Sequence, residues 1–217
     1  MTFLVDGFNL YHSLKNADRD LGGATTRWLD LAALCRFHLY LFGTNARLAE
    51  VHYVSALARH LEATNPDVTA RHKRYLDCLR ETGVQVHLNR FKKKTTRCAV
   101  CSAKNKHYEE KGTDVALAVA LAVALAVKLL ELLIRDACDT VVLVTGDTDL
   151  APAVRAAQSL FPQKRVAFAF PYKRKNKELA KLAPDSFVIG AKQYVQHQLA
   201  DPFRLANGTQ LAKPPTW

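Results

Sequence analysis

Apolar residues along the chain form short runs that alternate with longer segments of helical periodicity. The helical segments are TTRWLDLAALCRFHLYLFG, NPDVTARHKRYLDCLRETG, a stretch from about residue 151 to 160, and a short one near 176–182. The short runs are rich in Val and Phe, and six strands are expected, at TFLVDG, LAEVHYVSA, VQVHLNRF, DTVVLVTGDTDL, KRVAFAFP and SFVIG. This alternation predicts an α/β fold in which helices cover a mostly parallel sheet.

One apolar segment stands apart because it is repetitive. Residues 111–133, KGTDVALAVALAVALAVKLLELL, contain the unit Val-Ala-Leu-Ala three times from Val115. The uninterrupted run from Val115 to Val127 lies between Asp114 and Lys128, and it is shorter than the roughly 20 apolar residues that a membrane span needs. Ala and Leu are strong helix formers, so the segment is expected to be a buried core helix.

Two further segments lack periodicity. Residues 92–107, KKKTTRCAVCSAKNKH, are polar and basic and are expected as a loop or small subdomain. The last residues, 193–217, contain several prolines and are expected as an extended arm. The chain is therefore expected to contain one domain at 1–192, which includes the basic loop, and a C-terminal arm.

Net charge and cysteine content indicate the kind of binding partner and the cellular compartment. The 217 residues carry a net charge of +11 with a pI near 9.6, which favours a polyanionic partner, nucleic acid first and an anionic membrane surface second. The five cysteines are an odd number and no N-terminal signal sequence precedes them, which argues against a disulfide framework. A cytoplasmic protein is expected.

Acidic side chains follow the predicted strands. Asp6 ends the first strand, Asp147 and Asp149 follow VVLVTG, and Asp114 begins the repetitive helix, while Asn9 comes one short turn after Asp6. In an open α/β sheet, ligands bind beyond the carboxyl ends of the strands. Each residue alone is also a common capping or turn residue. Together they form an oxygen-rich cluster that suits Mg²⁺ or Mn²⁺.

The basic loop contains one Cys-x-x-Cys pair. Cys98 and Cys101 are followed by His107, and either His87 or Cys78 is a further candidate ligand for a structural Zn²⁺ ion. One pair supplies half of a zinc site, so free thiols remain the alternative.

Three sequence blocks, FLVDGFNLYHSL, EEKGTDVALAV and DTVVLVTGDTDLAPAVRAA, resemble the signature blocks of NYN-domain proteins, the bacterial branch of the PIN-like ribonuclease superfamily. The resemblance covers roughly residues 2–190. It implies a three-layer α/β/α fold and a metal-dependent endoribonuclease whose matching positions are Asp6, Asn9, Asp114, Asp147 and Asp149. Many relatives place another acid one to two turns after the residue that matches Asp114, where this chain has Ala120 and the apolar repeat.

The resemblance also suggests roles for these residues. Asp6 and Asp147 are expected as direct ligands of one or two metal ions, and Asp114 and Asp149 as ligands bound directly or through water. Asn9 is expected to orient Asp6 or to donate to a phosphate oxygen.

Two basic stretches, RFKKKTTR and FPYKRKNKELAK, combine clustered cations with an aromatic residue, which suits phosphate contacts and stacking on single-stranded RNA. Both follow predicted strands, so they are expected near the acids. The candidate RNA contacts are Lys92, Lys93, Lys94, Arg97, Lys111, Thr145, Lys173, Arg174 and Lys175.

The near-identical Val-Ala-Leu-Ala units suggest expansion of a short repeat. Each unit lengthens a helix by about 6 Å and rotates the residues beyond it by roughly 40°. We therefore hypothesise that the repeat weakens the enzyme, and that deleting eight residues increases cleavage. The alternative is that the repeat is simply the native core helix.

Other functions fit the motifs less well. A haloacid-dehalogenase phosphatase needs an acid two residues after its nucleophilic Asp, where Phe8 stands, and no Gly-rich fingerprint of a dinucleotide-binding enzyme follows a strand. A catalytically silent RNA-binding module remains the alternative. The sequence leaves open the oligomeric state, the RNA preference and the biological role, for which a toxin is one candidate.

Overall fold

The structure of the chain is a computed structural model. It describes the backbone of residues 1–89, 96–97, 104–105 and 113–217, and the side chains of residues 1–59, 61–89 and 118–217.

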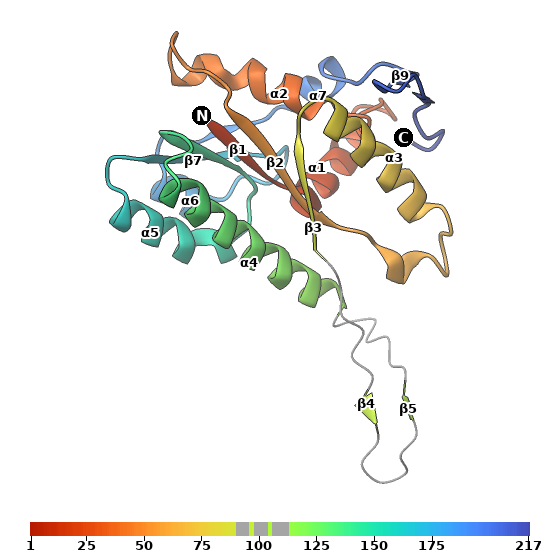
Figure 1. The fold of residues 1–217 in the computed structure, drawn as a ribbon, viewed down its shortest axis with the longest axis horizontal. Helices are drawn as coiled ribbons and strands as arrows, with labels where there is room; N and C mark the ends of the chain where they lie inside the picture. The colour runs from red at the N-terminus through yellow and green to blue at the C-terminus, as the bar shows by residue number, and fades with distance from the viewer. Residues whose placement is uncertain (90–95, 98–103, 106–112) are drawn as a thin grey trace.

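The centre of the molecule is a six-stranded sheet with the order β3-β2-β1-β6-β7-β8 (Figure 1). Every neighbouring pair of strands is parallel. The strands are β1 (Thr2–Asp6), β2 (Glu50–Ala56), β3 (Gln85–Asn89), β6 (Thr140–Val144), β7 (Arg165–Phe170) and β8 (Phe187–Val188). The six predicted strands and the parallel α/β class are therefore confirmed.

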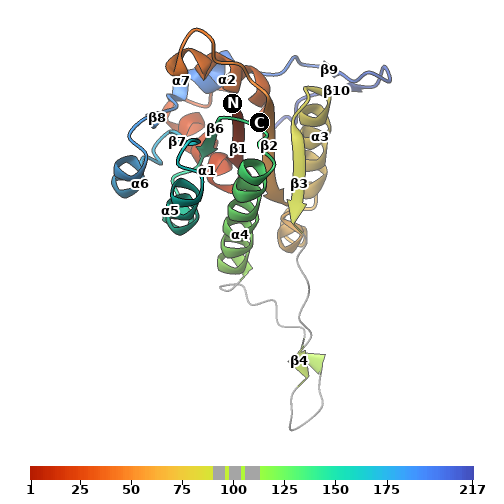
Figure 2. The same ribbon diagram turned by 60° about the vertical axis from the view of Figure 1, so that its left-hand side comes forward.

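Helices cover both faces of this sheet and give the expected three layers (Figure 2). One face carries α1 (Gly7–Asp20), α2 (Leu31–Phe37), α3 (Val68–Glu81) and α7 (Ala191–Gln196). The other carries α4 (Thr113–Ile134), α5 (Ala151–Leu160) and α6 (Lys177–Leu182). Short 3₁₀ turns are η1 (His38–Phe42), η2 (Arg59–Leu61) and η3 (Thr148–Leu150), and two small hairpins are β4 (Thr96–Arg97) with β5 (Lys104–Asn105) and β9 (Phe203–Arg204) with β10 (Gln210–Leu211).

The order of the strands reverses between β1 and β6. From β1 the chain proceeds to β2 and β3 on one side, and α4 then brings it back to β6 on the other side of β1. Val5 of β1 lies in register with Val144 of β6, so both strands end at the same edge. Connections leave a topological switch point in opposite directions, and the crevice between them is where ligands bind in open α/β sheets.

The repetitive helix α4 has one buried face and one exposed face. Leu121, Leu125 and Leu129 are buried against the sheet and α5, whereas Val123 and Val127 are exposed. A repeat of four residues is close to the 3.6 residues of a helical turn, so each residue type of the unit stays on one side of the helix. The predicted core helix is therefore present, but only its leucine face is buried. Within the described part of the chain, no helix is long and apolar enough to cross a membrane.

The C-terminal segment also differs from its predicted extended course. The expected boundary after residue 192 falls inside α7, and the hairpin of β9 and β10 follows. The ring of Trp217 lies 6.4 Å from that of Trp28 and 5.7 Å from that of Tyr75. Leu199 is buried, and its backbone N–H donates to the carbonyl oxygen of Trp28 at 2.9 Å. These apolar contacts hold the segment against the domain.

The two faces of α4 predict opposite mutational effects. Leu125→Ala should lower the free energy of unfolding by about 2–5 kcal/mol, because it leaves a cavity in a core position that is 1% exposed. Val123→Ala, at a position that is 58% exposed, should change it by less than about 0.5 kcal/mol. Urea unfolding followed by circular dichroism measures both. Equal losses in the two variants would contradict this assignment of the faces.

Candidate functional site

Asp6 is the buried centre of the site at the switch point. It ends β1 and caps the N-terminus of α1, and only 5% of it is exposed. Its Oδ1 accepts hydrogen bonds from the backbone N–H groups of Phe8 at 3.0 Å and Asn9 at 2.9 Å. Its Oδ2 accepts a hydrogen bond from Thr145 Oγ1 at 3.0 Å. These bonds hold the carboxylate in one orientation.

The residues after β6 complete a network with those after β1. The hydroxyl oxygen of Thr145 accepts a hydrogen bond from the backbone N–H of Asp147 at 3.1 Å. The side-chain oxygen of Asn9 accepts one from the backbone N–H of Gly146 at 3.2 Å. The two strand ends are therefore joined by side chains of the predicted site, and Asn9 links the two sides of the switch point rather than contacting the carboxylate of Asp6 through its side chain.

A cavity of about 300 Å³ opens over this network. Asp6, Asn9 and Asp147 line it from the two strand ends, and Arg174 lines it from the loop after β7. Its other lining residues are Phe8, His12, Ala118, Leu121, Gly146 and Thr148. The structure thus brings together three of the five predicted catalytic positions.

The surroundings of Asp6 disfavour the negative charge of its carboxylate. Burial raises the pKa of Asp6 above its ordinary value, and the nearby charge of Asp147 raises it further. The hydrogen bonds from Asn9, Thr145 and Phe8 act in the opposite direction because they stabilise the ionised form. A cation or a proton in this pocket therefore stabilises the folded protein.

Arg174 brings a positive group to the same cavity. Its Nε is buried and has no hydrogen-bond acceptor among the residues that the structure describes. Its backbone packs tightly against the loop after β6. The approach is so close that a β-carbon at Gly146 would lie 1.9 Å from the carbonyl oxygen of Arg174. Gly146 is thus required for the close approach of these two loops. A half-buried arginine whose Nε has no acceptor among the described residues suits an incoming phosphate.

Other predicted site residues lie elsewhere. Asp149 is exposed in η3, and its backbone N–H donates to Asp147 Oδ1 at 3.0 Å, as expected of a turn residue. Lys173 Nζ lies 2.6 Å from a carboxylate oxygen of Asp20 at the end of α1, and Lys175 is exposed. Asp149, Lys173 and Lys175 are not among the residues that line the cavity.

Several predictions fall outside the described residues. Asp114 lies in α4 four positions before Ala118, but its side chain is not described. Only the backbone of Arg97 is described, in β4. Lys92, Lys93, Lys94, Lys111, Cys98, Cys101 and His107 lie outside the described part of the chain.

His87 and Cys78, the two further candidate zinc ligands, lie in different parts of the fold. An imidazole nitrogen of His87 lies 2.9 Å from one of His52, which in turn contacts Glu50. Cys78 is a free thiol on the buried face of α3. Neither observation tests whether Cys98 and Cys101 bind zinc.

Sequence reasoning missed His12 as a site residue. It lies on α1 three positions after Asn9, and its ring makes an edge contact with the ring of Phe8 at 4.5 Å. The only signal was this spacing, since residues three apart share one side of a helix. Because a histidine at the surface of a helix is common, the spacing alone does not distinguish it.

The donor set fits a hydrated divalent cation. Within the described side chains, no group of three His, Cys, Asp or Glu residues is placed to hold a metal ion. Asp6 and Asp147 nevertheless face one cavity, and Mg²⁺ is commonly held by one or two carboxylates together with water and substrate phosphate. These two carboxylates could hold such an ion.

The raised pKa of Asp6 predicts the pH dependence of stability. The folded state retains the proton of Asp6 to higher pH than the unfolded state does. The free energy of unfolding therefore falls as the pH rises from the pKa of Asp6 in the unfolded state to its higher pKa in the folded state. Asp6→Asn removes this loss and should be as stable as the wild type near pH 4 and more stable at neutral pH in EDTA. Urea unfolding at both pH values measures the difference. Asp67→Asn, at the exposed position before α3, is the control for the loss of one negative charge.

Comparison with known proteins identifies the family. Among curated proteins, none matches the sequence. A solved structure of a protein of unknown function from Vibrio parahaemolyticus has a similar fold, with a TM-score of 0.54 and 17% identity over 87% of this chain and 91% of that chain. The sequence model of the NYN domain matches residues 3–190, a range that includes all of the six-stranded sheet except Thr2, together with Asp6, Asn9, Asp147 and Arg174. The chain belongs to the NYN domain family.

Proposed function

We propose that the protein is a metal-dependent endoribonuclease that cleaves single-stranded RNA. NYN domains are generally nucleases. The observation that carries the proposal is that a buried Asp6, a second carboxylate on Asp147 and the guanidinium of Arg174 surround one cavity at the switch point. The Nε of Arg174 has no acceptor in the described part of the chain. Two carboxylates and a guanidinium match a phosphate held beside a divalent cation.

Each residue has a distinct role in this proposal. Asp6 and Asp147 hold Mg²⁺ or Mn²⁺, with Asp114 and Asp149 contributing directly or through water, and the bound ion supplies activation of a water and charge stabilisation. Arg174 donates to the phosphate that is attacked. Thr145 keeps the carboxylate of Asp6 turned toward the cavity, since its hydroxyl already donates to that group at 3.0 Å.

Asn9 and the basic residues position the RNA. The side-chain oxygen of Asn9 is used by Gly146, which leaves its amide nitrogen to donate to a phosphate oxygen. The net charge of +11 attracts the polyanion. Lys92, Lys93, Lys94, Arg97, Lys111, Lys173 and Lys175 remain candidate phosphate contacts, and a zinc site at Cys98, Cys101 and His107 remains a prediction. A cytoplasmic location is consistent with the free thiols of Cys35, Cys78 and Cys138.

The first test is cleavage of a single-stranded RNA. The wild type should cleave it in Mg²⁺ or Mn²⁺ and stop in EDTA, and Asp6→Asn or Asp147→Asn should lower the rate by at least about a hundredfold, because each removes a ligand of the activating ion. Gel analysis of end-labelled RNA measures the rate. Asp139→Asn, at the opposite end of strand β6 from Asp147, is the matched control and should retain full activity.

Two outcomes would contradict the proposal. Full activity in both Asp6→Asn and Asp147→Asn would exclude these carboxylates as ligands. A wild-type protein that shifts RNA in a gel without cutting it, in either metal ion, would instead support the catalytically silent RNA-binding module.

The apolar repeat supports a second prediction within the same proposal. Ala118 lies in the repeat four positions after Asp114 and lines the cavity. It belongs to the stretch in which many NYN relatives have another acid. Ala118→Asp should therefore raise Mg²⁺-dependent cleavage by about tenfold, because it adds a carboxylate to the cation site. Ala120→Asp, at an exposed position of the same helix, is the control for the added charge.

Shortened chains test whether the repeat itself weakens the enzyme. Removing one unit places Asp114 at the helix position that Ala118 now has, and removing two units, eight residues, moves it about 12 Å along the helix axis. Cleavage should increase in at least one of the two chains, with circular dichroism confirming that both fold. Equal or lower activity in both well-folded chains, together with no gain from Ala118→Asp, would make the repeat simply the native core helix.

A further inference from the structure

The outer face of α1 leads away from the catalytic cavity. The inner face of this helix, which includes Leu10, Leu14 and Ala17, is buried in the core. The outer face carries Phe8, Tyr11, His12, Lys15 and Arg19, at spacings of three, four, seven and eleven residues from Phe8, which place them along one side of a helix. Phe8 and His12 line the cavity. The remaining three residues therefore extend from its rim along the helix.

Tyr11 presents an aromatic ring next to the cavity. It is 40% exposed, and its ring lies 5.7 Å from the ring of His12 in an edge arrangement. The Nζ atom of Lys15 lies 5.7 Å from the centre of the Tyr11 ring. An aromatic ring paired with a cation is suited to an unpaired nucleobase, because the base stacks on the ring while its own phosphate reaches the ammonium group.

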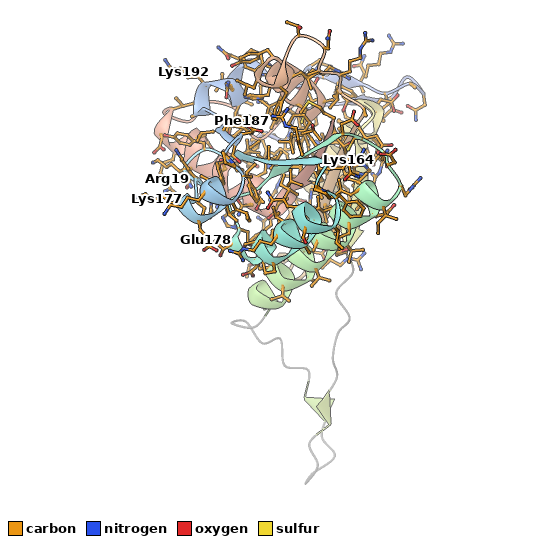
Figure 3. All side chains as sticks on the ribbon, turned by 90° about the vertical axis from the view of Figure 1, so that its left-hand side faces the viewer. Arg19, Lys164, Lys177, Glu178, Phe187 and Lys192 are labelled. Atoms are coloured by element: carbon orange, nitrogen blue, oxygen red, sulfur yellow. The ribbon has the colours of Figure 1, made fainter. Side chains whose placement is uncertain are left out.

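The charges along this side of the helix are positive. Asp18 and Asp20 are neutralised, by Arg27 at 2.8 Å and by Lys173 at 2.6 Å. Lys15 and Arg19 are exposed, and within the described part of the chain neither lies within 4.0 Å of a carboxylate. Figure 3 shows Arg19 at the outer surface of the molecule. Both cations are thus available to an anion that follows the helix from the cavity.

We propose that single-stranded RNA follows the outer face of α1, with one base stacked on Tyr11 and successive phosphates at Lys15 and Arg19. This track rests on the proposed nuclease function, since it begins at the cavity that contains Asp6 and Asp147. It also predicts a preference for single strands, because the bases of a duplex are stacked on each other and offer no free face to Tyr11.

Binding experiments test the track without requiring cleavage. Fluorescence anisotropy of a labelled single-stranded oligoribonucleotide, measured in EDTA, should show that Tyr11→Ala weakens binding by about fivefold to a hundredfold. Tyr11→Phe retains the ring and should bind as the wild type does. Lys15→Gln should weaken binding and reduce the slope of log affinity against log salt by about 0.7, the value for one phosphate contact on a single strand.

Matched controls come from the opposite edge of the sheet. Tyr40→Ala, at a position of η1 that is 65% exposed, and Arg47→Gln, beside the N-terminus, should leave the affinity unchanged. For a duplex RNA of the same sequence, Tyr11→Ala should also have no effect.

The outcomes separate the track from the nuclease function. If the wild type cleaves RNA but Tyr11→Ala and Lys15→Gln bind the single strand normally, the track is wrong and the nuclease proposal stands. If Tyr11→Ala weakens duplex binding equally, base stacking on Tyr11 is wrong. If the expected binding losses appear but no variant or wild-type protein cuts RNA in Mg²⁺ or Mn²⁺, the track stands and the nuclease proposal falls.

Discussion

The arrangement of the site depends on the three hydrogen bonds that the carboxylate of Asp6 accepts. Two come from backbone N–H groups in the first turn of α1, and the third comes from Thr145 after β6. The same carboxylate therefore caps a helix, ties together two neighbouring strand ends and faces the cavity. Capping is the ordinary role of an aspartate at this position, and here it also fixes the carboxylate for the proposed function. The raised pKa of Asp6 shows that these bonds do not offset the burial of its charge beside Asp147. A buried charge that costs stability is common at functional sites.

The capping by Asp6 also fixes the position of α1, whose outer face is exposed. Its N-terminus is held by Asp6, and its inner face packs in the core, so its outer face has a defined direction from the cavity. The helix α4 contributes to the same cavity in a different way. Its four-residue repeat keeps leucines on the sheet side and valines on the solvent side, and it places Ala118 and Leu121 at the cavity wall. The wall that α4 supplies is apolar at these two positions, and this is why the substitution Ala118→Asp is informative about the cation site.

Much of the fold follows from local patterns in the sequence. Six runs rich in β-branched and aromatic residues became the six strands, and the α/β alternation required parallel pairing with helices on both faces. The candidate acids could be grouped because the carboxyl ends of parallel strands meet at one edge. Asp6 and Asp147 were predicted on this basis, and the structure places both at the cavity.

The tertiary structure decided which of the predicted residues meet. Asp147 turns into the cavity while Asp149, two residues later, is exposed, because the direction of each side chain depends on the turn that η3 makes after β6. Arg174 reaches the cavity because its loop packs on Gly146, a contact between segments 28 residues apart that no local pattern encodes. The exposed valines of α4 could not be predicted, since the apolar run from Val115 to Val127 has no polar residues to mark its outer face. The sequence by itself determined the elements and their order, because these depend on periodicity, whereas the cavity, its guanidinium and the exposed face of α4 depend on contacts that exist only after the elements pack.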